Sequence, residues 1–558
     1  MKRFPMAAFS VVVVCSLILA ACAPATVAPA LTDTQAPAAA TDTQAPAAAT
    51  NTQAPAAATN IQPAAATNTQ VSAATNTQAP AAATDTPAAA AATNTPVALA
   101  TSTAGPTITP SPYPLATAEA GKVQVRWYIG LGTGTDAGQL TTEQAVVDDF
   151  NKSQDKIQLI MEVIPHNSAT DTLATEIASG NGPDIVGPVG WAGSNAFFGQ
   201  WLDLAPLIKS TNFDTSIFDT SLVNMYHTGD QGTVGLPFAV YPSAMEYNTA
   251  LFDQAGLKYP PAKYGDKYTF PDGTTADWTW DTVTKVAKLL TVDANGKNST
   301  EAGFDKTKIV QYGYSWTDEN QPEYWGAYWQ AGTELVPGGS KGSYKAAVPP
   351  AWVAAWTWMY NGIWGDQPFI ANNAVEESAD FGTGNTFNSG KIGMTVEPAW
   401  YTCCMSGVKT WDFAAMPSYN GKVGGRIDAD TLRILKSTKH PLEAFTAMTY
   451  LETTGVDKLV VGSAGNPPAY GAVPAIATKR QPFLDAAAAN FPWVKNYSTL
   501  MAGLQYPDVP SAEGYVPNFN EAWNRNTTFG NLLVTTAGLD LAKEQKTLES
   551  DLNTIYNK

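Results

Sequence analysis

The alternation of apolar and polar residues is clearest between positions 173 and 186. Leu173 and Ile177 lie four positions apart, so they share one face of a helix, and Gly180 can end that helix in the left-handed conformation. A short turn leads into Ile185-Val186, which starts a buried strand. A helix that passes into a strand through so few residues predicts half of a βαβ crossover. We therefore expect the following loop, residues 187–193, to lie at the carboxyl end of a parallel sheet, where open α/β sheets bind ligands.

The same periodicities predict further elements on both sides of this stretch. Before it, they indicate strands at 123–129 and 157–163 and helices at 142–150 and 168–179. Strands that alternate with helices in this way are typical of a doubly wound α/β fold. After it, the Pro- and Gly-rich stretch 234–242 is extended and suits a crossing between lobes. Three helices are also predicted: one capped by Thr279, one from Pro441 that ends before Gly455, and one at 539–556.

The N-terminal end has the layout of an export signal. Lys2 and Arg3 precede an apolar run that is short for a membrane span. The run ends in Leu19-Ala20-Ala21-Cys22, which resembles the bacterial lipoprotein box, and in that family the chain is cut before the cysteine, which then carries lipid. We therefore expect a signal peptide at 1–21 and a lipid on Cys22 that anchors the protein to the cell membrane, at the cell surface or in the periplasm. An ordinary signal peptide cut nearby is the alternative.

Residues 22–121 have a composition unlike that of the rest of the chain. They are rich in Ala, Thr, Pro, Asn and Gln, and a Thr-Asp-Thr-Gln-Ala-Pro unit recurs at 32–37 and 41–46. Such a segment buries too little apolar surface to offset its conformational entropy. We expect a disordered stalk that holds the folded part, about 122–558, away from a membrane surface. The folded part is long enough for two lobes with separate cores.

Charge and metal-ligand spacing exclude several classes of protein. The chain has 49 acidic and 32 basic residues, which argues against nucleic acid as a partner. The three histidines, at 166, 227 and 440, have no metal-ligand spacing, and we expect no metal and no cofactor. Outside the N-terminal region, Cys403 and Cys404 are the only cysteines. They form either a strained vicinal disulfide or two free thiols.

The aromatic residues indicate the class of ligand. The chain contains 16 Trp and 22 Tyr, and several lie in polar, Gly- and Pro-rich segments rather than at helical spacing: Trp191, Tyr241, Trp316, Trp325, Trp329 and Trp400. An aromatic face packs well against the C–H face of a sugar ring, and carboxylates accept hydrogen bonds from its hydroxyls. The sequence therefore predicts a sugar ligand.

An ordered set of motifs resembles the family 1 extracellular solute-binding proteins, the sugar receptors of ABC importers, which are similar in fold to maltose-binding protein. The motifs are Ser-Gly-Asn-Gly-Pro-Asp-Ile-Val at 179–186, Trp-Leu-Asp-Leu at 201–204, Gly-Leu-Pro at 235–237 with Tyr-Asn at 247–248, Thr-Trp-Asp at 279–281, and Phe-Asn-Ser-Gly-Lys-Ile-Gly-Met at 387–394 followed by Trp400. Each motif alone is modest, but their order is that of the family and covers nearly all of 122–558.

This resemblance implies a type II periplasmic-binding-protein-like fold: two α/β lobes with doubly wound sheets, joined by a hinge, with the ligand in the cleft. We place the first lobe at 122–238 plus 424–462 and the second at 239–423 plus 463–558. The implied protein is a monomeric receptor that delivers sugar or oligosaccharide to an ABC transporter permease. The ligand-binding positions carried over from the family, with two weaker candidates, are Thr133, Trp191, Tyr241, Glu397, Trp400, Asp428, Asp430, and then Trp316 and Trp325.

Two other classes of protein compete with this interpretation. A secreted glycoside hydrolase needs two carboxylates across the scissile bond, and Glu397, Asp428 and Asp430 are available for that role. We interpret them instead as acceptors for sugar hydroxyls, and expect no enzyme activity. A stalked carbohydrate-binding adhesin would fit the anchor but would not explain the order of the motifs.

Overall fold

Ten strands in the described part of the chain form one mixed sheet, in the order β2-β1-β3-β15-β6-β11-β10-β9, with β12 and β16 also paired to β6. The structure is a computed structural model that describes residues 115–228, 231–316, 321–330, 342–405, 407–506 and 516–558. The strands are β1 (Val123–Ile129), β2 (Ile157–Val163), β3 (Ile185–Val189), β6 (Ala239–Asn248), β9 (Val292–Asp293), β10 (Ile309–Tyr314), β11 (Ile392–Pro398), β12 (Trp411–Ala414), β15 (Ile427–Ile434) and β16 (Val473–Pro474).

Three two-stranded hairpins and the α-helices account for most of the other described elements. The hairpins pair β4 (His227–Thr228) with β5 (Gly232–Thr233), β7 (Lys267–Thr269) with β8 (Thr275–Asp277), and β13 (Ser418–Tyr419) with β14 (Lys422–Val423). The helices are α1 (Ala137–Ser153), α2 (His166–Ser179), α3 (Trp191–Ala196), α4 (Ala205–Thr211), α5 (Thr220–Met225), α6 (Thr249–Gln254), α7 (Trp280–Leu290), α8 (Pro322–Ala327), α9 (Pro350–Trp364), α10 (Asn373–Glu376), α11 (Pro441–Tyr450), α12 (Arg480–Asn490), α13 (Tyr497–Gly503), α14 (Phe519–Thr535) and α15 (Leu541–Tyr556).

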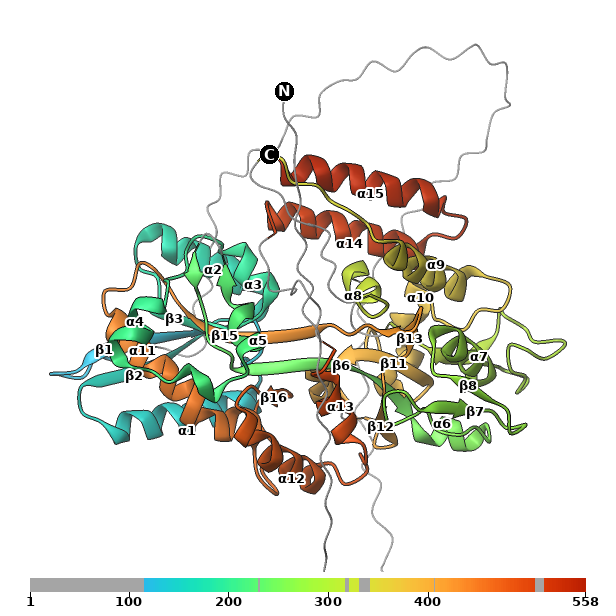
Figure 1. Ribbon diagram of the computed structural model, residues 1–558, viewed down its shortest axis with the longest axis horizontal. Helices are drawn as coiled ribbons and strands as arrows, with labels where there is room; N and C mark the ends of the chain where they lie inside the picture. Colours follow the sequence, from blue (N-terminus) through green and yellow to red (C-terminus); the bar gives the residue numbers. More distant parts are fainter. Residues whose placement is uncertain (1–114, 229–230, 317–320, 331–341, 406, 507–515) are drawn as a thin grey trace, which may run out of the picture. The chain divides into compact units, whose positions relative to one another are not determined.

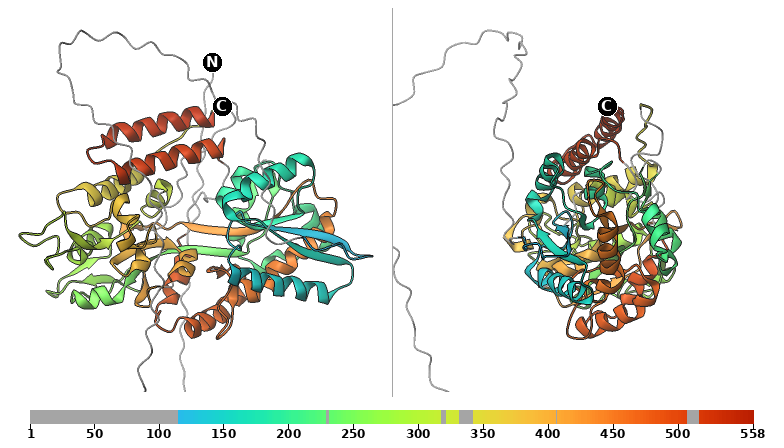
Figure 2. Two further views of the ribbon diagram at one scale, coloured as in Figure 1. Left: turned by 180° about the vertical axis from the view of Figure 1, so that it is seen from behind. Right: turned by 90° about the vertical axis from the view of Figure 1, so that its left-hand side faces the viewer.

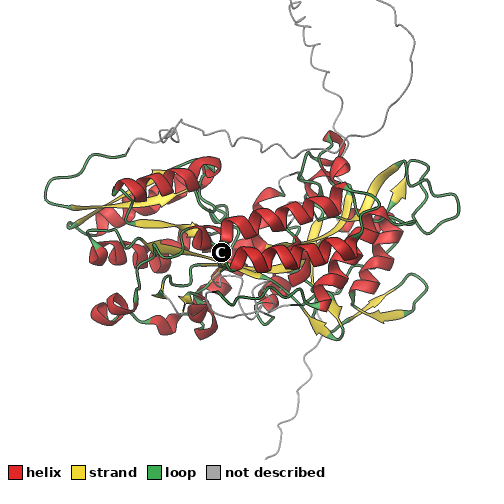
Figure 3. Ribbon diagram, turned by 90° about the horizontal axis from the view of Figure 1, so that it is seen from above, coloured by secondary structure: helices red, strands yellow, loops and turns green. Residues whose placement is uncertain are grey.

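Two neighbouring strands, β6 and β15, connect the two ends of the sheet. Figure 1 shows them side by side across the middle, and Figure 2 shows the same arrangement from behind. One end, which we call the β1 side, contains β1, β2 and β3 with helices α1, α2 and α3. The other, the β11 side, contains β9, β10, β11 and β12 with helices α7, α8 and α9. Figure 3 shows helices on both faces of the strands. The α/β class is therefore as predicted.

Strand alternation explains the layers of the β1 side. β1 pairs in parallel with both β2 and β3. Val125, Trp127 and Ile129 point to one face, where they pack with α1, and Tyr128 points to the other, where it packs with Leu173 of α2. All of these side chains are buried. This double layer of helices on a parallel sheet is the arrangement that the sequence predicts for 123–186.

Local signals place several element ends as predicted. Gly180 ends α2 in the left-handed region with φ of 75°. The Thr279 side chain accepts a hydrogen bond from the Thr282 amide at the start of α7. Trp280, Val283, Val286 and Leu290 form the buried apolar face of α7. Helix α15 begins at Leu541, slightly later than predicted, because the Asp540 side chain caps it through the Lys543 amide.

Three predicted boundaries are wrong. The helix predicted at 142–150 is α1, which begins at Ala137, because Gln139 Oε1 accepts from the Asp136 amide and closes an earlier cap. The loop predicted at 187–193 is almost absent, since β3 continues to Val189 and α3 begins at Trp191. The helix from Pro441 does not end before Gly455 but continues in wider turns as far as Val461.

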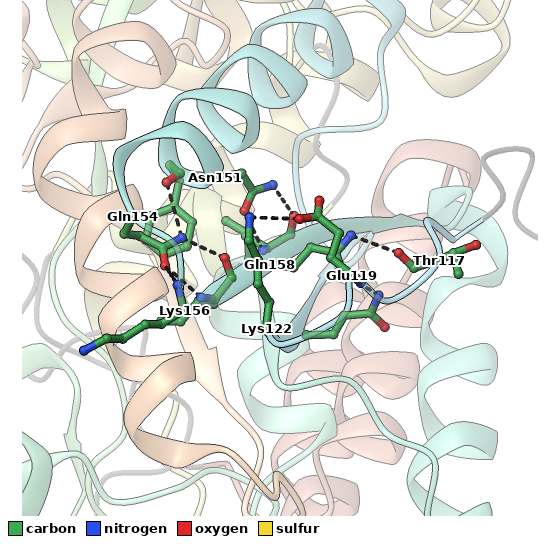
Figure 4. A network of polar contacts seen from close by, with 11 residues as sticks. Thr117, Glu119, Lys122, Asn151, Gln154, Lys156 and Gln158 are labelled. Atoms are coloured by element: carbon green, nitrogen blue, oxygen red, sulfur yellow. Dashed lines mark hydrogen bonds and ion pairs between the residues drawn. The ribbon is translucent and has the colours of Figure 1, made fainter.

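Ordered contacts begin ahead of the predicted boundary at 121. The side chain of Gln158 on β2 accepts from the Glu119 amide and donates to the Thr117 carbonyl, and Gln124 on β1 donates to the Ala116 carbonyl. Figure 4 shows Thr117 and Glu119 in this network on the strands. The predicted signal peptide, Cys22 and the stalk up to residue 114 lie outside the described residues.

The lobe boundaries stay a prediction. The described residues, from 115 to 558, all fall within one compact unit. Helix α12, which the sequence places in the second lobe, packs on residues 457–461 of the first, so contacts cross the predicted boundary. In the part of the chain that the structure describes, no helix is long and apolar enough to cross a membrane.

Candidate functional site

A cavity of about 390 Å³ lies where β6 and β15 pass between the two sides of the sheet. Its walls combine aromatic side chains, two carboxylates and glycine-rich backbone. The lining residues are Leu131, Gly132, Thr133, His166, Gly190, Trp191, Ala192, Gly193, Tyr241, Tyr324, Trp400, Asp428, Asp430, Gly471 and Trp523. Residues from distant parts of the chain, between positions 131 and 523, therefore meet at one site.

The pairing of β6 with β15 positions three of these side chains. In the antiparallel register, Asp428 lies opposite Tyr241. Asp428 and Asp430 are two positions apart on β15, so both point to the face of the sheet that carries the cavity. The two carboxyl groups are therefore neighbours on one face of the sheet. Because two negative charges repel each other, the protonated form of one carboxyl group is favoured.

Three side chains hold the carboxylate of Asp428. Arg426 Nε donates to Oδ1 at 2.6 Å, and the Tyr324 hydroxyl donates to Oδ2 at 2.8 Å. Trp400 Nε1 also points to Oδ2, at 3.3 Å. Both carboxylate oxygens are therefore engaged by the protein itself, which fixes the orientation of Tyr324 and Trp400 in the cavity wall.

The second carboxylate, Asp430, has an unusual protonation equilibrium. Burial raises its pKa to about 7, and the negative charge of Asp428 acts in the same direction, while a hydrogen bond with Tyr241 opposes the shift. Close to neutral pH, Asp430 is therefore present in both its charged and its neutral form. The neutral form can donate a hydrogen bond to a ligand, and the charged form can only accept one.

The loop after β1 forms the next part of the wall. A methyl group on Gly132 would lie 2.7 Å from the Pro188 carbonyl oxygen and 3.4 Å from Asp430 Oδ2, so the backbone approaches the acidic pair closely. Gln139 donates to the Thr133 hydroxyl at 2.6 Å and to the Ala469 carbonyl at 3.1 Å. The same side chain accepts from the Gly134 amide at 3.0 Å. Helix α1 therefore holds this loop in place through a single glutamine.

Trp191 begins α3 and forms the aromatic wall on the β1 side. Its ring packs against two aromatic rings of α14, with centroid distances of 5.1 Å to Phe519 and 5.0 Å to Trp523. Helix α14 itself packs on α8 and α9 of the β11 side. Aromatic contacts thus link the two sides at the wall of the cavity, which both Trp191 and Trp523 line.

Six of the predicted binding residues line this cavity: Thr133, Trp191, Tyr241, Trp400, Asp428 and Asp430. Three others do not. Trp316 and Trp325 are buried against each other, with ring centroids 6.2 Å apart, and Trp316 Nε1 donates to the Ala371 carbonyl. Glu397 is only 1 % exposed and accepts from the Thr395 hydroxyl at 3.2 Å. These three residues belong to the core of the β11 side.

Sequence reasoning missed several lining residues, chiefly His166, Tyr324, Gly471 and Trp523. Trp523 lies in an amphipathic helix, where an aromatic residue ordinarily indicates a core position. Tyr324 follows Pro322 in a short helix next to residues that the structure does not describe, and no local pattern marks it. Only the pairing of distant segments brings them to the site.

The structure describes candidate metal ligands of this chain but not the side chains of its two adjacent cysteines. Among the described residues, no group of three His, Cys, Asp or Glu side chains could hold a metal ion. The side chains of Cys403 and Cys404 lie outside the described part of the structure, so both predicted alternatives for them stay open.

Comparisons with known proteins identify the family. Residues 134–458 match the sequence profile of the bacterial extracellular solute-binding proteins. Curated binding proteins of Brucella abortus and Brucella suis are 26% identical over 285 residues, which is 48% of this chain and 60% of theirs. The match therefore spans less than two thirds of the length of these relatives.

Solved structures share the fold at low sequence identity. An ABC substrate-binding protein from Listeria monocytogenes in complex with cycloalternan is 20% identical, with a TM-score of 0.59, over 78% of this chain and 98% of that one. The sugar-binding protein MalE from Xanthomonas citri is 16% identical, with a TM-score of 0.56, over 78% and 97%. The predicted fold class is thereby confirmed. Since the family profile matches more than half of its length, this chain belongs to the bacterial extracellular solute-binding proteins.

Proposed function

We propose that this protein is a sugar or oligosaccharide receptor that binds its ligand in the cavity between the β1 side and the β11 side. The observation that carries this proposal is the lining of the cavity, which combines three tryptophans and two tyrosines with two aspartates. Aromatic faces favour the apolar faces of sugar rings, and aspartates favour hydroxyl groups. The sugar complexes among the structural relatives support the same ligand class.

In this mechanism the sugar bridges the two sides of the sheet. Thr133 and Trp191 contact it from the β1 side, and Trp400, with Tyr324 and Trp523, contacts it from the β11 side, while Tyr241 and Asp430 contribute from the crossing strands. The predicted lobes close about β6 and β15, and the closed form docks on an ABC permease that takes over the sugar.

A thermal shift series tests the proposal. The full-length protein is heated with maltotriose, mannotriose or tagatose, and a ligand that binds only the folded state raises the unfolding midpoint with the logarithm of its concentration. We expect a saturable rise with one sugar class, and chromatography should then recover that sugar unchanged. No rise with a broad panel of mono- and oligosaccharides would refute a sugar ligand, and recovered hydrolysis products would favour the glycosidase.

We further propose that the receptor is a lipoprotein. The apolar run and the Leu-Ala-Ala-Cys ending at Cys22 support a cleaved signal at 1–21 and a lipid anchor, followed by the stalk. Replacement of Cys22 by serine should move the protein from the membrane fraction to the soluble fraction. Cys15→Ser, within the apolar run, is the matched control and should leave the protein at the membrane. Equal distribution of both variants would contradict lipidation at Cys22.

A further inference from the structure

Arg426 is a buried cation directly behind the cavity wall. It precedes β15, and its side chain is 2% exposed. Its backbone carbonyl accepts from both the Ser243 amide, at 3.0 Å, and the Ser243 hydroxyl, at 2.7 Å. Arg426 does not line the cavity, but it is anchored to β6 at the point where the two sides of the sheet meet.

The guanidinium group of Arg426 occupies a cage of aromatic rings and a carboxylate. Its Cζ lies 3.9 Å from the ring centre of Tyr324 and 4.8 Å from that of Trp191. Its Nε donates to Asp428 Oδ1 at 2.6 Å. The guanidinium charge also opposes the rise in pKa that burial gives to the nearby carboxyl of Glu323. Aromatic faces around a carboxylate are the arrangement with which proteins bind cationic ligands.

We propose that Arg426 is a specificity-determining positioning residue: it fills this cage with the protein's own cation, so that the cavity accepts neutral solutes and rejects cationic ones. This proposal rests on the function proposed above in one respect, because it takes the cavity as the site where the solute binds. Three of the cavity-lining side chains, Trp191, Tyr324 and Asp428, touch the guanidinium directly. Arg426 therefore acts on the solute through the walls of the site.

The contacts of Asp428 explain why a cationic solute is rejected. One carboxylate oxygen is paired with Arg426, and the other accepts from Tyr324 and Trp400. A cationic solute that bound Asp428 would have to displace a desolvated ion pair, and it would then lie beside the guanidinium, which carries the same sign of charge. A neutral polyol needs only Asp430, Tyr241 and the aromatic faces.

Chemical rescue tests the cage without knowledge of the solute. Arg426→Ala removes the cation and leaves a guanidinium-sized space beside Asp428. Methylguanidinium chloride at millimolar concentration should then raise the unfolding midpoint of this variant saturably. Sodium chloride and urea at equal concentrations are the controls. The wild type should show no rise, and the double variant Arg426→Ala/Asp428→Asn should lose most of it. A wild type that responds equally, or a single variant that does not respond, would overturn the proposal.

A second pair of variants covers the case in which Arg426→Ala does not fold. Arg426→Met fills the space without a charge and leaves Asp428 as a buried, unpaired acid, whereas Arg426→Met/Asp428→Asn removes both charges. Replacing both members of a buried ion pair destabilises far less than removing one. The double variant should therefore unfold at a higher temperature than the single variant. The reverse order would refute a guanidinium–carboxylate pair.

Solute selectivity provides the functional readout. For whichever oligosaccharide raises the midpoint of the wild type, the matched amino sugar, with an ammonium group in place of a hydroxyl, should bind at least tenfold more weakly. In Arg426→Ala this preference should shrink or reverse. A wild type that prefers the amino sugar would overturn the proposed rejection of cationic solutes. If no sugar of the panel binds but methylguanidinium still stabilises Arg426→Ala, the proposed sugar-receptor function is refuted and the cage around Arg426 is still supported.

Discussion

The carboxyl group of Glu143 makes the stability of the binding loop depend on pH. Glu143 lies on α1 with no exposed surface, and its Oε1 accepts from the Tyr470 hydroxyl at 2.6 Å. A methyl group on Gly134 would lie 2.6 Å from the same oxygen, so this carboxyl packs directly under the loop that carries Thr133. Burial raises its pKa from 4.5 to about 8, against the opposing hydrogen bond from Tyr470.

The sign of the effect follows from proton uptake. The folded protein keeps the Glu143 proton to a higher pH than the unfolded chain does, so folding takes up a proton between pH 4.5 and 8. The contribution of this group to stability is complete below pH 4.5 and falls as the pH rises through that window. At about 1.4 kcal/mol per pKa unit, the loss between pH 5 and pH 7 is about 2 to 3 kcal/mol.

Glu143→Gln tests this reasoning because glutamine does not titrate and its oxygen can still accept from Tyr470. Urea unfolding of the wild type and the variant is compared at pH 5 and at pH 7. The variant should gain about 2 to 3 kcal/mol relative to the wild type between these two pH values. Asp148→Asn, on the exposed face of the same helix, is the matched control. If the difference in unfolding free energy between the variant and the wild type changes by less than about 0.5 kcal/mol from pH 5 to pH 7, Glu143 is not a buried neutral acid.

Three further predictions concern the site and its surroundings. Trp400→Ala should weaken sugar binding at least tenfold in a fluorescence titration, because it removes a ring from the cavity wall; an unchanged affinity would remove Trp400 from the site. Glu397→Gln should leave sugar affinity unchanged in the same titration, since the carboxylate lies outside the cavity, and a large loss would contradict that placement. Gly132→Ala should destabilise by about 1 to 3 kcal/mol in thermal unfolding, because its methyl group meets the Pro188 carbonyl, whereas Gly138→Ala, with open space around it, should be neutral or stabilising.

The sequence predicts those parts of the fold that depend on local signals. Periodicity and the glycine at position 180 place β1, β2, α2 and the start of β3, because these signals lie within the elements themselves. The same signals cannot place β15, which lies between β3 and β6 only because distant segments pair. Element boundaries were missed where a single side chain decides the cap, as Gln139 does for α1.

The residues of the binding site were likewise predictable only in part from the sequence. Tyr241, Asp428 and Asp430 could be proposed from motif order, since they lie on the crossing strands. Aromatic residues in polar segments were a weaker guide, because composition does not reveal which face of an element a ring occupies. Trp316 and Trp325 are accordingly core residues, while Trp523, on an ordinary amphipathic helix, lines the cavity.

The position of β15 in the sheet has a consequence for the order in which the chain can fold. β3 is complete at Val189, but the strand that pairs with its free edge ends only at Ile434. At a synthesis rate of about 5–20 residues per second, this edge waits roughly 12–50 s for its partner. Contacts of such long sequence separation slow folding, and an unpaired strand edge is open to association with other chains. During synthesis the β1–β3 unit therefore presents an unpaired strand edge to other chains until residue 434 has been made.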